Sequence, residues 1–210
     1  MDDDPQTYQE AIKAYDKPEW EQGIEDKQGS LHQHRVWTLI PRSSIPSNWH
    51  IIKSKLHFLC KQNKHGDIVQ SKVQAVAKDF SQIPGIDYKE TFALVACLES
   101  VRVILHLGAK HNWEIDQLDF KTAFLHGNLK EELYMEQPEG MTEPGKEDWF
   151  WKLNKTLYGL KQASQRWFKK LHDSMVKEGY KIWECVFAAG KEILNRYADW
   201  DGKNVMSNSS

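Results

Sequence analysis

The stretch Trp113–Phe120, WEIDQLDF, decides how this sequence is interpreted, together with the residues Lys121–Phe124, KTAF, that follow it. Its alternation of apolar and polar residues predicts a β-strand that ends at Asp119. A carboxylate at a strand end, just before a tight turn with an aromatic residue, is a candidate ligand for Mg²⁺. Asp116 lies three residues before Asp119, so in a regular strand the two side chains point to opposite faces and cannot share one ion. From these residues alone, an exposed strand-end acid is the favoured alternative.

The composition indicates a folded chain of mixed structure. The 210 residues include 28 Lys and Arg, 30 Asp and Glu, and 40% apolar residues, with a formal net charge of -2. Nine Trp, eight Phe and seven Tyr provide large surfaces to bury, which argues against a wholly disordered chain. Because the net charge is close to zero, any binding of nucleic acid has to come from local basic patches.

Several protein classes are excluded or disfavoured by simple features. No segment approaches the ~18 consecutive apolar residues of a membrane span, and the acidic start Met1–Pro5 is unlike a secretory signal. The cysteines Cys60, Cys97 and Cys185 are widely separated, which predicts reduced thiols and disfavours a zinc site or disulfides. We therefore expect an intracellular protein, cytoplasmic or nuclear, without a membrane partner. Walker A, GxGxxG, HExxH and GxSxG motifs are absent from the sequence.

The periodicity predicts a mixed α+β chain. The expected elements are a helix that begins at Asp16–Glu19, strands over Val36–Ile40, Ile51–Leu59, Ile68–Ala77 and Trp113–Phe120, short strands over Leu133–Met135 and Trp149–Leu153, and helices over Leu98–Lys110 and Gln162–Glu178. Gly179 stands where a helix-terminating glycine is expected. After Gly179 the pattern is poor, and one or two short elements are all that it supports.

A basic segment accompanies two of these strands. Between Lys53 and Lys78 there are six lysines and a single acid, Asp67, and the polar connection Gln62–Asp67 predicts a hairpin loop. A solvated hairpin surface is the commoner explanation for such charge, by about two chances in three. The alternative is a groove that faces the phosphates of a nucleic acid.

Three separated stretches resemble the reverse transcriptase of copia-type LTR retrotransposons. They are Ser71–Val95 (SKVQAVAKDFSQIPGIDYKETFALV), Trp113–Met141 (WEIDQLDFKTAFLHGNLKEELYMEQPEGM) and Trp151–Leu171 (WKLNKTLYGLKQASQRWFKKL). Three motifs in the order of the family make the resemblance specific, and it covers roughly Tyr8–Gly179.

The resemblance implies a right-hand polymerase fold with fingers and a partial palm, an incomplete palm sheet and no thumb. We expect a flexible N-terminus (1–15), a fingers-like region with an N-terminal helix and the basic hairpin (16–112), a partial palm with the Asp119 motif and a C-terminal helix (113–180), and a divergent tail (181–210). The implied activity is DNA synthesis from dNTPs on an RNA or DNA template–primer with two Mg²⁺ ions.

The resemblance also assigns roles to single residues. Asp119 matches the first catalytic carboxylate, which binds both metal ions, and the backbone carbonyl of Phe120 is a further metal ligand. Phe124 matches the aromatic residue that packs under the incoming sugar and rejects a 2′-hydroxyl. Lys72 lies in the strand that resembles the triphosphate contact. The remaining candidates are Tyr158, Gly159, Lys161 and Gln162 for the nucleotide, and Lys53, Lys55, Lys61 and Lys64 for nucleic acid.

Some residues depart from the pattern of the family. Where the family usually has KARLVAKGF, Lys72–Phe80 reads KVQAVAKDF. Gln74 thus replaces an arginine and removes a fixed phosphate-binding charge. Asp79 replaces a glycine and adds a negative charge near the phosphates. Leu94 replaces the proline of ETFAPV.

The second metal motif of the family, Tyr-x-Asp-Asp, does not occur in this sequence. Its nearest counterpart is Tyr197–Trp200, which makes Asp199 a weak second catalytic candidate. The interpretation we slightly prefer is that Tyr197–Gly202 resembles the start of the RNase H domain of the family. Because two Mg²⁺ ions require several carboxylates, we expect a reverse transcriptase fragment that does not polymerise alone. The alternatives are a non-catalytic nucleic-acid-binding module and an inert retrotransposon relic.

Overall fold

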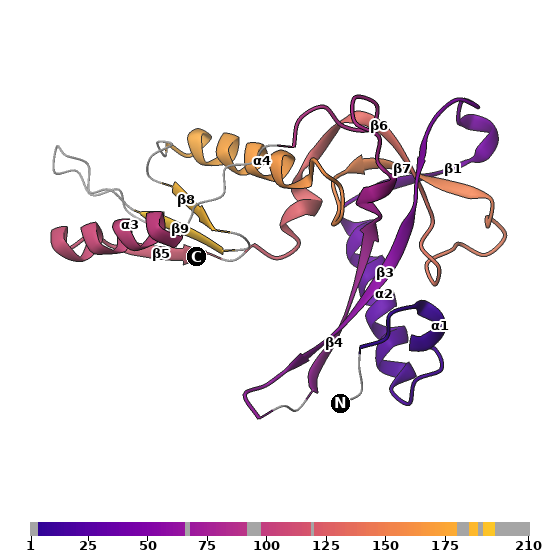
Figure 1. Cartoon of the computed structure of the whole chain (residues 1–210), viewed down its shortest axis with the longest axis horizontal. Helices are drawn as coiled ribbons and strands as arrows, with labels where there is room; N and C mark the ends of the chain where they lie inside the picture. Colours follow the sequence, from indigo (N-terminus) through magenta and orange to yellow (C-terminus); the bar gives the residue numbers. More distant parts are fainter. Residues whose placement is uncertain are drawn as a thin grey trace. The chain divides into compact units, whose positions relative to one another are not determined.

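A computed structural model describes residues 4–65, 68–91, 98–118, 120–179, 185–188 and 191–195. The chain forms two compact units that each combine segments distant in sequence (Figure 1). The first unit comprises Met1–Phe92 and Phe124–Trp167, and the second comprises Ala93–Ala123 and Phe168–Ser210. The mixed α+β class expected from the sequence is confirmed. The division into units follows packing and crosses the boundaries that we drew along the chain.

A four-stranded sheet forms one part of the first unit. Its strands lie in the order β1 (Trp37–Pro41), β7 (Trp149–Lys155), β6 (Asn128–Glu136) and β2 (Ile51–Ile52). The pairs β1–β7 and β6–β7 are antiparallel, and β2 pairs with β6 in parallel. The short 3-10 helix η1 (Arg42–Ser44) follows β1, and η3 (Ala123–His126) precedes β6. A further 3-10 helix, η2 (Asp79–Ser81), follows the strand Ile68–Ala77 outside this sheet.

A long antiparallel hairpin of β3 (Ser54–Gln62) and β4 (Ile68–Ala77) forms the other part, and α2 (Lys17–Gln33) lies beside it in Figure 1. The Trp20 ring of α2 meets the Phe58 ring of β3 edge-to-face, with centroids 5.4 Å apart. Gly23 permits this approach, since a Cβ there would lie 2.9 Å from Val73 Cγ2. One face of the hairpin is therefore buried under α2.

The strand predicted over Ile51–Leu59 is divided in the structure. Ile51 and Ile52 pair with β6, whereas Ser54 onward pairs with β4, so the chain changes its partner at Lys53. The helix predicted from Asp16 is present, with Asp16 at the N-cap position, although its side chain makes no capping hydrogen bond. The strand β4 has the bounds that the sequence predicted.

The N-terminal segment is packed where the sequence led us to expect flexibility over residues 1–15. Tyr8–Ala11 form α1, which Thr7 caps by accepting a hydrogen bond from the backbone N–H of Glu10. Ala11 is fully buried, and the Tyr8 ring lies against Gly140, where a Cβ would be 2.6 Å from the ring. This part of the expected N-terminal segment thus contains a helix whose apolar residues join the core.

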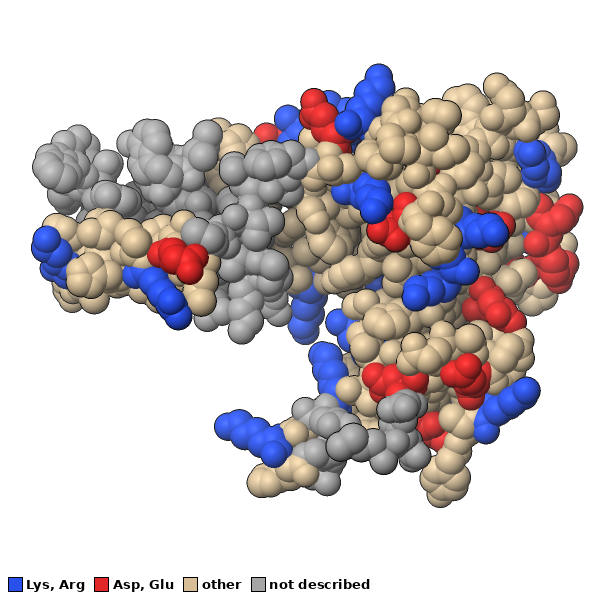
Figure 2. Space-filling view, viewed as in Figure 1, with Lys and Arg blue, Asp and Glu red and all other residues tan. Residues whose placement is uncertain are grey.

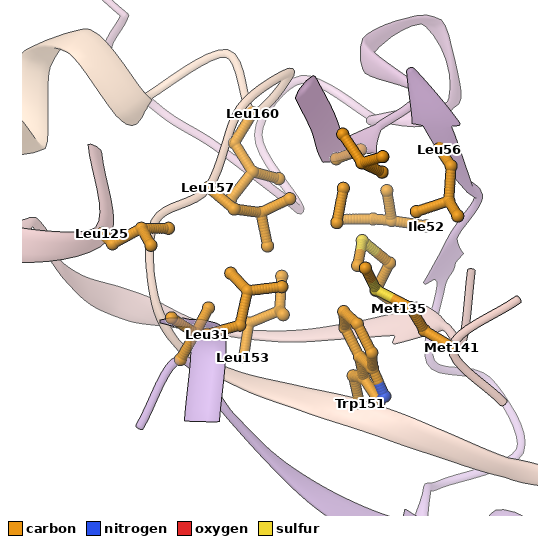
Figure 3. Close-up of a cluster of buried hydrophobic side chains, with 14 of the residues drawn as sticks. Leu31, Ile52, Leu56, Leu125, Met135, Met141, Trp151, Leu153, Leu157 and Leu160 are labelled. Carbon is orange, nitrogen blue, oxygen red and sulfur yellow. The ribbon is translucent and has the colours of Figure 1, made fainter. Parts of the chain in front are cut away.

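The core of the first unit lies between the sheet, the hairpin and α2. Figure 3 shows buried side chains from all of these elements, among them Leu31, Ile52, Met135 and Trp151. The Trp151 ring stacks on the Trp37 ring with centroids 3.9 Å apart. Full burial of each large apolar side chain contributes about 1.5–3 kcal/mol, so this cluster is the main source of stability for the first unit.

The second unit contains α3 (Leu98–His111) and a three-stranded antiparallel sheet in the order β5 (Ile115–Leu118), β9 (Lys191–Asn195) and β8 (Cys185–Ala188). The strand β5 is shorter than the predicted Trp113–Phe120. The helix α4 (Ala163–Lys177) begins in the first unit and continues into the second. Gly179 follows it with a φ of 92°, as expected for a helix-terminating glycine. None of the described helices combines the length and apolar character needed to cross a membrane.

Candidate functional site

The segment Leu157–Gln162 lies along the edge of β4 that does not pair with β3. Val76 and Tyr158 form an isolated parallel bridge, and the backbone N–H of Ala77 donates to the Tyr158 carbonyl oxygen at 2.8 Å. Gly159 has a φ of 86°, and a Cβ there would lie 2.0 Å from the Ala77 carbonyl oxygen. Only glycine fits both the conformation and the space, so Gly159 lets this segment join β4.

A buried chain of amides ties the same segment to the loop after η2. Gln162 is fully buried, its Nε2 donates to the Asp87 carbonyl oxygen at 3.0 Å, and its Oε1 accepts from Gln82 Nε2 at 3.1 Å. Gln82 Oε1 in turn accepts from the backbone N–H of Lys161 at 2.7 Å. Gln162, a predicted nucleotide contact, thus uses both ends of its amide inside the protein.

The Asp87 carboxylate holds the loop Ile83–Asp87 in place. Asp87 is only 2% exposed, and its Oδ2 accepts hydrogen bonds from the Ile83 backbone N–H and from His50 Nδ1, each at 2.7 Å. A buried carboxylate requires such partners. This loop is therefore a supporting element for the segment Leu157–Gln162.

Lys161 forms an ion pair with Asp79, with Nζ and Oδ2 separated by 2.7 Å. The hydrogen-bonded pair raises the pKa of Lys161 and lowers the pKa of Asp79. Asp79 is the acid that replaces the family's glycine. The Lys161 ammonium, another predicted nucleotide contact, is therefore paired with the Asp79 carboxylate.

Two aromatic residues from the predicted site lie together. The Phe124 and Tyr158 rings meet edge-to-face with centroids 4.8 Å apart. Phe124 belongs to η3, which is held by the fully buried Thr156, whose hydroxyl donates to the Phe124 carbonyl oxygen. A Cβ on Gly127 would lie 2.6 Å from Thr156 Oγ1, so this glycine allows the close packing. The aromatic pair thus has a rigid base.

The hairpin lysines share the face that points away from the buried side. The register pairs Lys55 with Val76, Leu59 with Lys72 and Lys61 with Gln70, on the face opposite the buried pairs Leu56–Ala75 and Phe58–Val73. Lys53, just before β3, and Lys64, in the connecting turn, are exposed. Within the described residues, the structure shows no salt bridge to Lys53, Lys55, Lys61, Lys64 or Lys72.

The basic character of the hairpin is local. Figure 2 shows Lys and Arg interspersed with Asp and Glu over the face that it draws. That face shows no single large basic field, and among the described residues the hairpin lysines form a local basic patch.

Lys27 is a functional candidate that the sequence analysis missed. Its Nζ lies 6.0 Å from the centroid of the Tyr158 ring. Burial lowers the pKa of Lys27, and the charge of Lys72 lowers it further. A signal was present in the sequence, because Lys27 lies seven residues after Trp20 and four before Leu31, at positions that share one helical face.

The metal-binding part of the predicted site falls mostly beyond the described residues. Asp119 and Asp199 both lie outside them, as does Leu94. Phe120 is described and is 38% exposed. Within the described part of the chain, no three His, Cys, Asp or Glu residues come together as a metal site would require.

Comparisons with known proteins identify relatives over most of the chain. A family model described as "Reverse transcriptase (RNA-dependent DNA polymerase)" matches residues 34–199. The chain is 38% identical, over 179 residues, to the Retrovirus-related Pol polyprotein from transposon TNT 1-94 of Nicotiana tabacum, with 85% of this chain and 13% of that protein covered. It is 34% identical, over 170 residues, to the Retrovirus-related Pol polyprotein from transposon RE2 of Arabidopsis thaliana, with 81% and 12% covered.

A third relative is more distant. The Transposon Ty1-BL Gag-Pol polyprotein of Saccharomyces cerevisiae is 33% identical over 111 residues, which cover 50% of this chain and 6% of that protein. The chain thus spans only a small part of the length of each of these relatives. No solved structure gives a significant match.

Proposed function

This chain belongs to the reverse transcriptase (RNA-dependent DNA polymerase) family, in its copia-type retrotransposon branch, and we propose that it forms the nucleotide- and template-binding part of such a polymerase. The observation that carries the proposal is the hydrogen bond between Ala77 and Tyr158. It joins two of the stretches that mark the family, Ser71–Val95 and Trp151–Leu171, which are distant in sequence. The basic hairpin and the aromatic pair are thereby placed in one unit.

We assign the regions of the polymerase hand as the sequence suggested. Residues 16–112, with α2 and the basic hairpin, correspond to fingers, and residues 113–180 to a partial palm, with 181–210 as a divergent tail. The antiparallel sheet that contains β5 supports a palm-like role for the second unit. The hairpin β3–β4, with one face packed on α2 and its lysines on the other, supports the fingers assignment.

The substrates in this proposal are an RNA or DNA template–primer and dNTPs. Lys53, Lys55, Lys61 and Lys64 contact backbone phosphates, and Lys72 contacts the triphosphate. Phe124 packs under the sugar, supported by Tyr158. Because such binding releases counterions, its affinity falls steeply with salt.

Catalysis in this family depends on divalent metal ions. In this chain, the Asp119 carboxylate and the Phe120 carbonyl would hold Mg²⁺, which would stabilise the charge that develops during phosphoryl transfer. Two ions about 3.5–4 Å apart need several carboxylates to bind them. The donor set of this chain is therefore too small unless Asp199 joins it.

The sequence argues against that contribution from Asp199. Tyr197–Trp200 has Trp where the motif Tyr-x-Asp-Asp has its second aspartate. On this basis we propose that these 210 residues do not polymerise by themselves.

Binding of a primer–template tests the proposed function. We expect fluorescence anisotropy to show binding that weakens steeply between 50 and 200 mM salt, as it does for proteins that neutralise several phosphates. The double variant Lys53→Glu/Lys55→Glu should lose about tenfold in affinity on any sequence, since both charges face the phosphates. Lys13→Glu/Lys17→Glu, with the same change of net charge on exposed residues outside the hairpin strands, is the control. Equal losses in both variants would refute a specific role of the hairpin.

A non-catalytic nucleic-acid-binding module is the second candidate. The unpaired hairpin lysines favour it, because they need no metal to bind phosphates. It predicts the same binding as the first candidate but no dependence of nucleotide binding on Phe124. A Phe124→Ala variant that binds dNTP as the wild type does would therefore favour the module.

A further inference from the structure

The chain from η2 to Asp87 exposes several large apolar side chains to water. Phe80 is 78% exposed, Ile86 is 63% exposed and Ile83 is 39% exposed. A single exposed apolar residue is common on a protein surface and needs no explanation. Three of them in one short loop are a candidate interaction surface. We call Phe80, Ile83 and Ile86 the loop patch.

The backbone of this loop is held by buried polar residues. Gln82 and Asp87 are 6% and 2% exposed, and both bind partners from other parts of the chain. The Ile83 N–H donates to the Asp87 carboxylate at 2.7 Å, and the Ser81 hydroxyl donates to the Lys78 carbonyl oxygen at 2.6 Å. The loop patch is therefore displayed on a supported backbone, which lowers the entropy cost of binding a ligand.

The loop patch is joined to the end of the basic hairpin. The backbone N–H of Lys53, just before β3, donates to Ser81 Oγ at 3.1 Å. The Lys53 carbonyl oxygen accepts from the backbone N–H of Lys78 at 2.8 Å. Phe80 stands between these two partners of Lys53 in the sequence. The exposed ring thus belongs to the turn that is bonded to the first lysine of the hairpin segment.

The charge that remains around the loop patch is positive. Each acid of residues 79–90 is engaged by a partner within the protein, namely Asp79 by Lys161, Asp87 by His50 and Glu90 by Gln165. Lys53, Lys78 and Lys89, in contrast, form no salt bridge among the described residues. An apolar surface with such cations complements a ligand that combines flat apolar faces with negative charge. The unpaired bases and phosphates of a single-stranded nucleic acid have this combination.

We propose that the Phe80 ring stacks on an unpaired base of a single-stranded nucleic acid, and that Ile83 and Ile86 offer apolar surface to the neighbouring base. Every base has a π face, so this contact does not depend on sequence. A duplex keeps its bases paired and stacked on one another, so Phe80 distinguishes unpaired strands from duplex. The inference rests on the proposed function in one respect, that the bound strand is the unpaired part of the template.

Fluorescence anisotropy on three DNAs tests the proposal: an oligo-dT, a primer–template with a template overhang, and a blunt duplex of the same paired length. Phe80→Ala should lose about fivefold or more in affinity for the first two, and less than about twofold for the blunt duplex, because only unpaired bases stack on the ring. Phe80→Trp should keep the affinity of the wild type. Tyr15→Ala removes another exposed aromatic ring, outside the loop, and should stay within about twofold of the wild type.

The salt dependence of binding separates stacking from charge and from loss of structure. Phe80→Ala should keep the wild-type slope of log affinity against log salt concentration, because it removes no contact with a phosphate. Lys53→Glu/Lys55→Glu should give a shallower slope. The melting temperature of Phe80→Ala should equal that of the wild type, since the ring is exposed. A lower melting temperature together with equal losses on all three DNAs would assign Phe80 a structural role and overturn the proposal.

The other outcomes separate this proposal from the proposed function. Wild-type affinity of Phe80→Ala for the oligo-dT and the overhang overturns the stacking contact and leaves the proposed function intact. A chain that binds oligo-dT through Phe80 but binds no primer–template refutes the proposed function alone. A wild-type chain that binds no DNA overturns both. Sedimentation that shows self-association lost in Phe80→Ala, with DNA binding unchanged, would assign the loop patch to a second copy of the chain and overturn the proposal.

Discussion

At the scale of single residues, Gly159 lies at the junction between β4 and the segment Leu157–Gln162. Its positive φ and its closeness to the Ala77 carbonyl oxygen both exclude a side chain. We predict that Gly159→Ala destabilises the protein by about 2–4 kcal/mol, which is the range for strained backbone combined with a steric clash. Urea unfolding measures this change.

Gly145 provides the matched control for this substitution. It also has a positive φ, of 77°, but nothing lies within 4 Å of the Cβ that would be added. Gly145→Ala should therefore cost only the backbone term, about 1–2 kcal/mol. Equal losses in the two variants would mean that the contact with Ala77 has no effect on stability.

Asp79 is the residue whose charge limits the site most directly, through its ion pair with Lys161. The hydrogen bond with Lys161 lowers the pKa of Asp79, so the carboxylate is ionised at neutral pH. The ion pair is lost only as the pH falls through this lowered pKa. Asp79→Asn should free the Lys161 ammonium at neutral pH. We predict that affinity for dTTP rises about two- to fivefold, a modest gain because exposed ion pairs are weak.

The double variant Asp79→Asn/Lys161→Met supplies the control for that measurement. It lacks both charges, so its affinity should return to the level of the wild type or below. An affinity of Asp79→Asn that is unchanged or weaker than that of the wild type would show that Lys161 does not contact the nucleotide.

At the scale of elements, the amide chain through Gln162 connects the segment Leu157–Gln162 to the loop Ile83–Asp87. Gln162→Leu keeps the volume but leaves Gln82 Nε2 and the Asp87 carbonyl oxygen buried without these partners. Each unpaired group costs about 1–3 kcal/mol, so we predict a loss of about 2–4 kcal/mol in urea unfolding.

Gln22→Leu is the control for this loss. Gln22 is exposed on α2 and bonds only locally, to Asp26. Its substitution should change the free energy of unfolding by less than ~0.5 kcal/mol. If Gln162→Leu costs no more than Gln22→Leu, the amide chain does not hold these elements together.

The elements also show how far the sequence predicted the structure. Strand β4 and helices α3 and α4 were predicted well, because apolar periodicity defines them and Gly179 marks the end of α4. The division of Ile51–Leu59 at Lys53 was not predicted, since it depends on two different partner strands. The role of Lys27 was missed because an amphipathic pattern normally assigns lysine to solvent.

The arrangement of the candidate site followed from the sequence only in part, for physical reasons. The Phe124 and Tyr158 rings lie together, while their roles toward a nucleotide stay predictions. Gln162 and Lys161, in contrast, make internal contacts that no local pattern encodes. The family motif fixes which residues occur, whereas long-range hydrogen bonds fix which of their atoms remain accessible.

At the scale of the whole molecule, we expect the chain to bind substrates without catalysing their reaction. The first unit has a well-packed core and carries the hairpin lysines and the aromatic pair. Of the carboxylates that catalysis would require, the sequence offers Asp119 as the proposed metal ligand, and Tyr-x-Asp-Asp does not occur in it. We therefore expect a protein that binds substrates of a polymerase and does not join nucleotides on its own.

Primer extension on the purified chain tests this account most directly. With an RNA or DNA template, a primer, all four dNTPs and either Mg²⁺ or Mn²⁺, we predict no template-dependent product, while the same preparation binds the primer–template in a salt-dependent way. The Asp119→Asn variant should give the same background. Template-dependent extension by the wild type that Asp119→Asn abolishes would contradict the account, because it would require a complete set of metal ligands.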